Sequence, residues 1–335
     1  AGDLVMARIE HDVVGIGNAI VDIIGRCKND FLIKHNLAKG HMTLVDADRV
    51  SHLYTEMGPA VEISGGSAAN TMVGIASLGG RSAFIGKVSE DEFGTIFRHD
   101  IRAAGVAFDT PPSTGGVPTA RSLILVTPDG QRTMNTFLGV SPELSPRDVD
   151  AALIEASRIV YLEGYLFDRP DAQAAFRHAA DMAERAGREV ALTLSDGFCV
   201  ERHRLEFLEL IRHRVDILFA NESEITALYG AATFEEAARQ AKADAKVAVL
   251  TRSAKGSVIF KGDKAVSVPA APIRQVLDTT GAGDLYAAGF LYGYTNGKSL
   301  DVCGHLGSLA AGEIISHIGA RPETSLAALA AARGL

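Results

Sequence analysis

Hydrophobic residues in the second half of the chain fall into short runs that alternate with longer amphipathic stretches. The runs at 158–165, 188–196, 215–222 and 246–253 are rich in apolar and β-branched residues, which is typical of buried strands. The Ala-rich stretches 170–187 and 233–244 lie between them and have helical spacing. Residues 256–270 predict a hairpin that turns at Gly262 and Asp263, and 299–319 predict a final helix. This alternation predicts an α/β fold with a mostly parallel central sheet and helices on both faces, a Rossmann-like three-layer arrangement.

The first half of the chain is less regular. Residues 11–27 open with a strand, and 82–89 supply another. The segments about 38–64 and 115–138 contain short strand-like runs with turn residues, and they interrupt the alternation. They predict a small β-sheet lid over one edge of the main sheet. No linker or repeat separates the halves, so we predict a single domain over 1–335 that carries this lid.

Composition narrows the function classes. The chain has 335 residues, 47% of them apolar, and a formal net charge of −8. This acidic balance argues against a nucleic-acid partner, because phosphate backbones favour concentrated Lys and Arg. Three cysteines without a CxxC pair predict neither a disulfide framework nor a thiolate zinc site. No apolar run reaches the roughly 18 residues of a membrane span, and 1–10 lack a signal-peptide pattern, so we expect a cytoplasmic enzyme without a membrane partner.

Two other phosphate motifs are incomplete. The stretch 293–299, GYTNGKS, is one residue too short for a P-loop and follows a helix. The stretch 15–20, GIGNAI, has Ile20 in place of the third glycine of a dinucleotide fingerprint. No helix is expected after it, because 21–24 continue the strand. Both patterns therefore argue against those nucleotide-binding modes.

The most informative stretch is DTTGAGDLYAAGFLYGY at 278–294. A strand is expected to end near Asp278 and a helix to begin around Gly283. Small residues at 281–283 leave backbone N–H groups open, and with the helix dipole they would stabilise negative charge. Asp284 could simply stabilise the dipole from the first helical turn. It could also accept a proton from a hydroxyl that attacks a phosphoryl group, beside an anion hole formed by Gly281, Ala282 and Gly283.

Polar residues elsewhere could bind a polyol. Asn18 and Asp22 are expected on one strand, and their even separation directs them to the same face. Gly65 and Gly66 precede a predicted helix, with Asn70 one turn inside it. Asn70 could bond a ligand hydroxyl or, alternatively, the local backbone.

A further motif, NESE at 221–224, follows a strand and opens a helix. Asn221 could be an N-cap with Glu224 completing a capping box. The pair could also hold a hydrated Mg²⁺ near ATP phosphates, since Mg²⁺ often keeps its waters. The two roles are compatible.

Together these motifs resemble those of the ribokinase-like (PfkB) family of carbohydrate and nucleoside kinases. DTTGAGD looks like its C-terminal signature, GGSAAN at 65–70 like its glycine motif, and NESE like its metal-linked motif. They occur in the family's order, from residue 15 to about 322. The resemblance implies a ribokinase-like fold with a β lid, and MgATP as the phosphoryl donor.

The resemblance also implies roles for individual residues. Asp284 would be the catalytic base. The residues that would contact the nucleotide are Asn221, Thr251, Ser253 and Gly256, with Ser308 beside the adenine. Asp278 and Thr280 match positions that hold a monovalent cation such as K⁺ in many relatives.

The acceptor is inferred from the same resemblance. Residues 192–200, LTLSDGFCV, lack the Asn and Arg usual in sugar-kinase members and look more like the adenosine kinase branch. Arg132 matches an arginine that reaches the transferring phosphate there, and Leu138 and Phe167 could form an apolar slot for a purine or simply pack. We therefore expect a phosphotransferase with an alcohol acceptor, which converts adenosine to AMP in purine salvage. The alternative is a sugar kinase of the same fold. The sequence leaves open a monomer or a homodimer paired through the lid.

Overall fold

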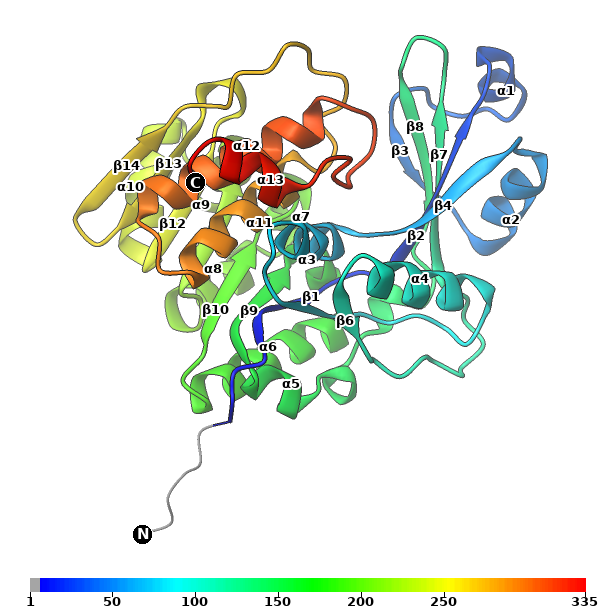
Figure 1. Ribbon diagram of the computed structural model, residues 1–335. Coiled ribbons are helices and arrows are strands. Elements are labelled where there is room, and N and C mark those ends of the chain that lie inside the picture. Colours follow the sequence, from blue (N-terminus) through cyan, green and yellow to red (C-terminus); the bar gives the residue numbers. More distant parts are fainter. Residues whose placement is uncertain (1–6) are drawn as a thin grey trace.

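Two β-sheets organise the protein, as the computed structural model of residues 7–335 shows (Figure 1). The strand order of the larger sheet is β14-β13-β12-β11-β10-β9-β1-β5-β6. Its strands are β1 (His11–Ile16), β5 (Ser82–Ile85), β6 (Val106–Phe108), β9 (Ser157–Glu163), β10 (Glu189–Thr193), β11 (Ile217–Asn221), β12 (Val247–Thr251), β13 (Ser257–Lys261) and β14 (Lys264–Val268). The strands from β6 to β12 pair in parallel, and the hairpin β13–β14 adds two antiparallel edge strands. The predicted, mostly parallel sheet and its hairpin are confirmed.

Helices cover both faces of this sheet. One face carries α3 (Ser67–Ser77), α4 (Glu92–Ala103), α11 (Ala282–Thr295), α12 (Leu300–Ile315) and α13 (Leu326–Ala332). The other carries α5 (Ala151–Glu155), α6 (Pro170–Arg185), α7 (Gly197–Arg202), α8 (Arg204–His213), α9 (Glu222–Tyr229) and α10 (Phe234–Asp244). Successive strand residues supply the two cores, because side chains alternate across a strand: Val13 packs in the first and Val14 in the second. The three layers of the predicted fold are thereby confirmed.

The smaller sheet stands beside the main body, at the right of Figure 1. Its order is β3-β8-β7-β2-β4. Its strands are β2 (Ile20–Arg26), β3 (Met42–Leu44), β4 (Ala60–Gly65), β7 (Ala120–Val126) and β8 (Arg132–Phe137), accompanied by α1 (Asn29–Lys34) and α2 (Ala47–Glu56). Val21 and Ile23, on one face of the small sheet, pack with Val50 and Leu53 of α2. The opposite face of the small sheet is not covered by these two helices. We call this small sheet with its two helices the lid.

The prediction that residues 21–24 continue the first strand is wrong. β1 ends at Ile16 and β2 begins at Ile20 in the other sheet. Gly17 lies at the break, where a Cβ atom would come within 2.8 Å of Glu163 Oε1. Asn18 therefore lies between the strands, and the argument that Asn18 and Asp22 share a strand face does not hold.

The strand expected to end near Asp278 is also absent. β14 ends at Val268, and residues 269–281 contain no strand. Pro269 and Pro272 lack the N–H group that a sheet ladder requires. Leu277 N–H instead donates to the Ile315 carbonyl at the end of α12 (2.8 Å). We call residues 278–284 the glycine–aspartate loop. The segment that leads to this loop is irregular and is hydrogen-bonded to the end of α12.

Within residues 7–335, none of the helices combines the length and the apolar character needed to cross a bilayer. The prediction that residues 1–10 lack a signal-peptide pattern includes residues 1–6, which lie outside the described residues.

Candidate active site

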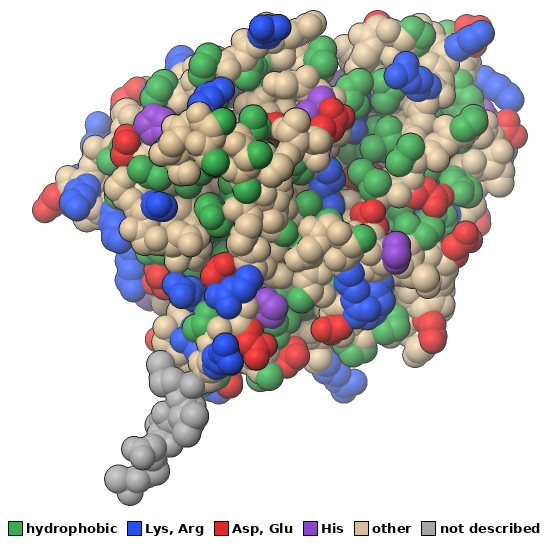
Figure 2. Space-filling model, in the orientation of Figure 1, with side chains coloured by type: hydrophobic (Ala, Val, Ile, Leu, Met, Phe, Trp, Pro, Cys, Tyr) green, Lys and Arg blue, Asp and Glu red, His purple; other side chains and the backbone are tan. Residues whose placement is uncertain are grey.

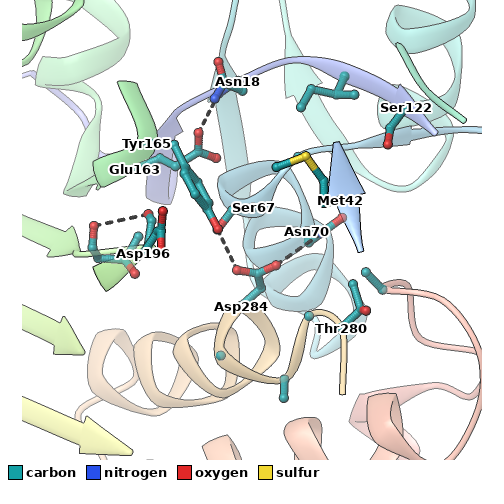
Figure 3. A pocket seen from close by; sticks show the side chains of 18 of the residues that line it. Asn18, Met42, Ser67, Asn70, Ser122, Glu163, Tyr165, Asp196, Thr280 and Asp284 are labelled. Atoms are coloured by element: carbon teal, nitrogen blue, oxygen red, sulfur yellow. Dashed lines mark hydrogen bonds between the residues drawn. The ribbon is translucent and has the colours of Figure 1, made fainter. Parts of the chain in front are cut away.

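A cavity of about 620 Å³ lies between the main sheet and the lid. Glu163, Thr193, Asn221 and Thr251, the last residues of β9, β10, β11 and β12, line its floor. Ligands of open α/β sheets bind at the carboxyl ends of strands. The residues labelled in Figure 3 converge on this cavity from α3, α11, β9, the lid and the loops between elements.

Most of the predicted site residues meet at this cavity. Those that line it are Asn18, Asp22, Gly66, Asn70, Arg132, Leu138, Asn221, Glu224, Thr251, Thr280, Gly281, Ala282, Gly283 and Asp284. Those absent from its lining are Gly65, Phe167, Ser253, Gly256, Asp278 and Ser308. Segments more than 200 residues apart in sequence are therefore brought to one place.

Asp284 lies in the first turn of α11, but its carboxylate is bound by a different helix. Ser67 Oγ donates to Oδ1 at 2.6 Å, and Asn70 Nδ2 donates to Oδ2 at 3.2 Å, both from α3 (Figure 3). Burial raises the pKa of Asp284 above the usual carboxyl range, while these two hydrogen bonds and the charge of Arg321 lower it. A carboxylate held by side chains of a neighbouring helix, facing a cavity, fits a proton acceptor better than a helix cap.

The glycine loop before Asp284 has the geometry of an anion site. Gly281 is the N-cap of α11 and has φ of 81°, a left-handed conformation that favours glycine. The Ala282 N–H donates to the Thr279 carbonyl at 3.2 Å. Within residues 7–335, the N–H groups of Gly281 and Gly283 have no backbone or side-chain acceptor. The predicted trio therefore offers two N–H groups, which point from a helix N-terminus at the cavity.

Asp22 projects from β2 beside the glycine pair. A Cβ atom on Gly65 would come within 2.4 Å of Asp22 Oδ2, so glycine is needed there to admit the carboxylate. Gly66 has φ of 105°, and a Cβ atom would lie 2.2 Å from the Asn18 carbonyl oxygen. Burial raises the pKa of Asp22 to about 6, against the opposing charges of Arg321 and Arg132.

Glu163 is a buried carboxylate at the crossing from the main sheet to the lid. Its Oε2 accepts from Asn18 N–H and its Oε1 from Ala68 N–H, both at 2.9 Å. Burial raises the pKa of Glu163 to about 7. Asn18 Oδ1 in turn accepts from Ser141 Oγ. Glu163 therefore ties β9 to the connection between β1 and β2 and to the start of α3.

Arg132 and Asp278 form an ion pair that joins lid strand β8 to the glycine–aspartate loop. Both side chains are nearly buried, with exposures of 9% and 7%. The Asp278 carboxylate also accepts from Thr280 N–H (3.0 Å) and Gly319 N–H (3.1 Å). Arg132 thus reaches the loop that was expected to hold phosphate, and it occupies the carboxylate that was assigned to a monovalent cation.

Asn221 and Glu224 form the capping box that the sequence predicts. Asn221 Oδ1 accepts from Glu224 N–H (2.8 Å), and Glu224 Oε1 accepts from Asn221 N–H (3.0 Å). Burial raises the pKa of Glu224 to about 7, and a nearby cation would favour its ionised form. Among residues 7–335 no cluster of three His, Cys, Asp or Glu side chains could cage a metal. This donor set fits Mg²⁺ held through waters and substrate phosphates.

The other residues assigned to the nucleotide lie apart from the cavity lining. Ser253 has φ of 53°, in the left-handed region where glycine is favoured. A Cβ atom on Gly256 would come within 2.1 Å of the Val268 carbonyl oxygen. Ser308 Oγ donates to the Pro269 carbonyl (3.2 Å). Their assigned contacts with ATP remain predictions.

The predicted apolar slot is only half present. Leu138 lines the cavity, but Phe167 is 1% exposed and stacks on Phe207 with ring centroids 4.2 Å apart. Phe167 therefore belongs to the core under α6 and α8. The apolar lining comes instead from the free face of the lid, where alternate residues of each strand point at the cavity.

Register defines two rows on that face. Asp22, Ser122, Thr136 and Leu44 are cross-strand neighbours on β2, β7, β8 and β3. We call Asp22, Ser122 and Thr136 the polar row, after the hydrogen-bonded hydroxyls of Ser122 and Thr136 (2.8 Å); the apolar Leu44 lies at its β3 end. The next residues on the same face are Ile24, Ile124, Met134 and Met42, which we call the apolar row. Figure 2 shows hydrophobic side chains on the lid beside the groove.

Sequence reasoning missed several residues of the site. Ser67 lies inside the quoted glycine motif, and a helix N-terminus facing a carboxylate could have indicated it. Glu163 lies near the end of the predicted strand 158–165, the end at which ligands of open α/β sheets bind. No sequence signal singled out Arg321, whose Nε donates to Asn70 Oδ1 at 2.8 Å. The lid rows required knowledge of the strand register.

Comparison with known proteins places the chain in a family. The sequence profile of the pfkB family carbohydrate kinases matches residues 34–326. The structure of adenosine kinase from Sinorhizobium meliloti is 55% identical, covers 97% of this chain and 99% of its own, and superimposes with a TM-score of 0.88. A probable sugar kinase protein from Rhizobium etli is 53% identical, covers 98% and 99%, and has a TM-score of 0.89.

A relative from yeast is also an adenosine kinase. Adenosine kinase from Saccharomyces cerevisiae is 26% identical over 92% of this chain and 95% of its own. The relatives thus include both adenosine and sugar kinases, and the phosphotransferase class is common to them. The chain belongs to the pfkB family of carbohydrate kinases.

Proposed function

We propose that the protein is an ATP-dependent nucleoside kinase, which transfers the γ-phosphoryl group of MgATP to the 5′-hydroxyl of adenosine and forms AMP. The observation that carries this proposal is the juxtaposition of the two lid rows. Asp22 of the polar row lies beside the glycine pair, and the apolar row is its neighbour on the same lid face, between the polar row and Arg132. A nucleoside combines the same two characters, because a polar ribose joins a flat, largely apolar base.

The apolar row is poorly suited to a free sugar. Its four large side chains would face hydroxyl groups, each of which costs free energy when it is buried without a hydrogen-bond partner. Packed against a purine, the same side chains bury apolar surface on the ligand, which stabilises the complex by roughly 25 cal/mol per Å². Adenosine kinase from Sinorhizobium meliloti, at 55% identity over nearly the whole chain, supports the same acceptor.

The reaction follows from the geometry around Asp284. The 5′-hydroxyl oxygen attacks the γ-phosphorus and forms the new P–O bond, its proton passes to the Asp284 carboxylate, and the bond to the β-phosphate oxygen breaks so that ADP leaves. Ser67 and Asn70 fix the carboxylate for this transfer. The N–H groups of Gly281 and Gly283 lie where they stabilise charge on the transferring group.

Other residues of the chain complete the site. Asn221 and Glu224 would hold Mg²⁺ through its waters, and the chemistry that Mg²⁺ supplies when bound is neutralisation of charge on the phosphate oxygens. Asp22 and Asn18 would bind the ribose hydroxyls. Arg132 is paired with Asp278, three residues before Gly281, and would contact a phosphate oxygen once that ion pair rearranges.

A sugar kinase of the same fold is the second candidate, favoured by the likeness to the probable sugar kinase protein from Rhizobium etli. A coupled assay of ADP formation separates the two, with adenosine, inosine, guanosine, ribose and fructose at matched concentrations. We expect kcat/KM for adenosine to exceed that for ribose at least about a hundredfold, because a buried base adds several kcal/mol. Faster turnover of a free sugar would overturn the nucleoside assignment and leave the phosphotransferase intact.

A further inference from the structure

Arg321 follows α12 and reaches the centre of the site, although nothing in the proposed reaction yet uses it. Its side chain lines the cavity, and its Nε donates to Asn70 Oδ1 at 2.8 Å. Its Nη2 is buried and has no acceptor among residues 7–335. Buried polar groups without partners are rare, because each costs free energy, and they concentrate where function requires them.

The hydrogen bonds of Arg321 have only one possible direction. A guanidinium has donors and no acceptor, so the oxygen of the Asn70 amide must face Arg321. The amide nitrogen then faces Asp284, to which Nδ2 donates at 3.2 Å. An amide between a guanidinium and a carboxylate has its orientation fixed from both sides. Arg321, Asn70 and Asp284 therefore form a directed chain that ends at the proposed base.

The segment that carries Arg321 is attached to the same loop as the base. Gly319 N–H donates to the Asp278 carboxylate at 3.1 Å. Ala320 lies against Gly281, where an added Cβ atom would come within 2.9 Å of the Ala320 side chain. Arg321 is thus held in a fixed relation to the anion site, and thermal motion of the segment would move both together.

The charges around Asp284 give Arg321 a second effect. The ionisable groups whose fields couple to Asp284 are Tyr161, Glu163, Tyr165, Glu224 and Arg321. Asp22 and Asp100 lie near Arg321 as well. Burial and the acidic neighbours disfavour a charged Asp284, whereas the hydrogen bonds from Ser67 and Asn70 and the cation Arg321 favour it. Arg321 therefore acts on Asp284 both through its own charge and through the Asn70 amide that it holds.

We propose that Arg321 is a positioning residue for phosphoryl transfer: it fixes the Asn70 amide that holds Asp284, and its charge keeps that carboxylate in the ionised form that accepts the proton. This inference rests on the proposed function, since it concerns the base of that reaction. It assigns Arg321 no contact with the acceptor. Its removal should therefore change kcat and the pH dependence more than the affinity for either substrate.

The test is the pH profile of kcat and kcat/KM for Arg321→Met, with MgATP and adenosine. Met keeps the aliphatic stem and removes both the donor and the charge. We expect kcat to fall about a hundredfold near neutral pH, since small misplacements of catalytic groups cost this much. The acid limb should move to higher pH, and KM for MgATP should change little. KM for adenosine should also change little at pH values well above 6, where Asp22, whose pKa Arg321 lowers, is ionised in the variant too. Arg321→Lys, which keeps the charge, should leave the acid limb close to that of the wild type.

Two further variants make the result decisive. Arg333→Met, an exposed arginine in the same C-terminal region, should behave as the wild type. Asn70→Ser removes the middle link and should also lower kcat and raise the acid limb, which provides the test if Arg321→Met does not fold. A wild-type pH profile in folded Arg321→Met, or a loss confined to KM for MgATP, would overturn the inference alone. If Asp284→Asn kept full turnover, Asp284 would not be the base and the inference would fall with that assignment, whereas a wild-type enzyme that did not phosphorylate adenosine would overturn the proposed function.

Discussion

The ion pair between Arg132 and Asp278 should contribute substantially to stability, and Asp278→Asn tests this. In the wild type the carboxylate accepts from Arg132 and from the N–H groups of Thr280 and Gly319. The Asn side chain has nearly the same shape, but it carries no charge and replaces one acceptor oxygen with a donor. Arg132 would then be a nearly buried, uncompensated cation.

The size of the loss follows from burial. With exposures of 9% and 7%, the pair has little access to water, and removal of one partner of such a pair costs about 3–5 kcal/mol. We expect the free energy of unfolding to fall by about 3 kcal/mol, near the lower limit, because opening of the lid would let water reach Arg132. Arg132→Met combined with Asp278→Asn should recover part of the loss, since an apolar replacement of both partners is often close to neutral.

Urea denaturation followed by circular dichroism provides the measurement, with midpoint and slope fitted for each variant. The matched control is Asp109→Asn, which breaks the exposed pair with Arg102 and should change stability far less. If Asp278→Asn were no more destabilising than Asp109→Asn, the pair would be worth no more than a surface contact. The link between the lid and the glycine–aspartate loop would then need another explanation.

Three other outcomes follow from the geometry. Gly281→Ala should lower kcat at least about tenfold and destabilise the protein by about 1–2 kcal/mol, because its φ of 81° disfavours a side chain. Gly283→Ala has open space around the added methyl group and should be as stable as the wild type when both variants are compared by thermal denaturation. Leu44→Ala on the lid, 60% exposed beside the cavity, should raise KM for adenosine about tenfold, while Ile33→Ala on α1, 77% exposed and away from the cavity, should not. Adenosine affinity measured by calorimetry should weaken as the pH falls below about 6. The pKa of Asp22 is raised to about 6, so its charged form, which accepts hydrogen bonds from the ribose, is present above that pH and lost below it. An affinity that did not change with pH would show that Asp22 does not bind the ribose.

Local sequence predicted the main sheet well because its strands are buried on both faces. Runs such as 247–250 are apolar throughout, and the amphipathic helices between the strands have the spacing of helices packed on a sheet. The glycine–aspartate loop could also be located from the sequence, because its small residues directly precede a helix. Short-range patterns of this kind carry most of the information about elements and their caps.

Tertiary contacts determined what the sequence did not reveal. The chain leaves the main sheet after Ile16, where Gly17 makes room for the carboxylate of Glu163, a residue far away in sequence. Phe167 looked suitable for a base slot, yet its ring packs on Phe207. Arg321 follows a helix without any motif, and only the fold brings it to Asn70.

The central claim is that Asp284 accepts the proton of the acceptor hydroxyl, and the most direct test is the kcat of Asp284→Asn with MgATP and adenosine. The amide can still be held by Ser67 and Asn70, so the site should keep its shape and its affinity for adenosine. We expect kcat to fall by a factor of about 10²–10⁴, the usual contribution of a positioned base, with the dissociation constant of adenosine almost unchanged. Wild-type turnover by Asp284→Asn would contradict the mechanism, whichever acceptor the enzyme uses.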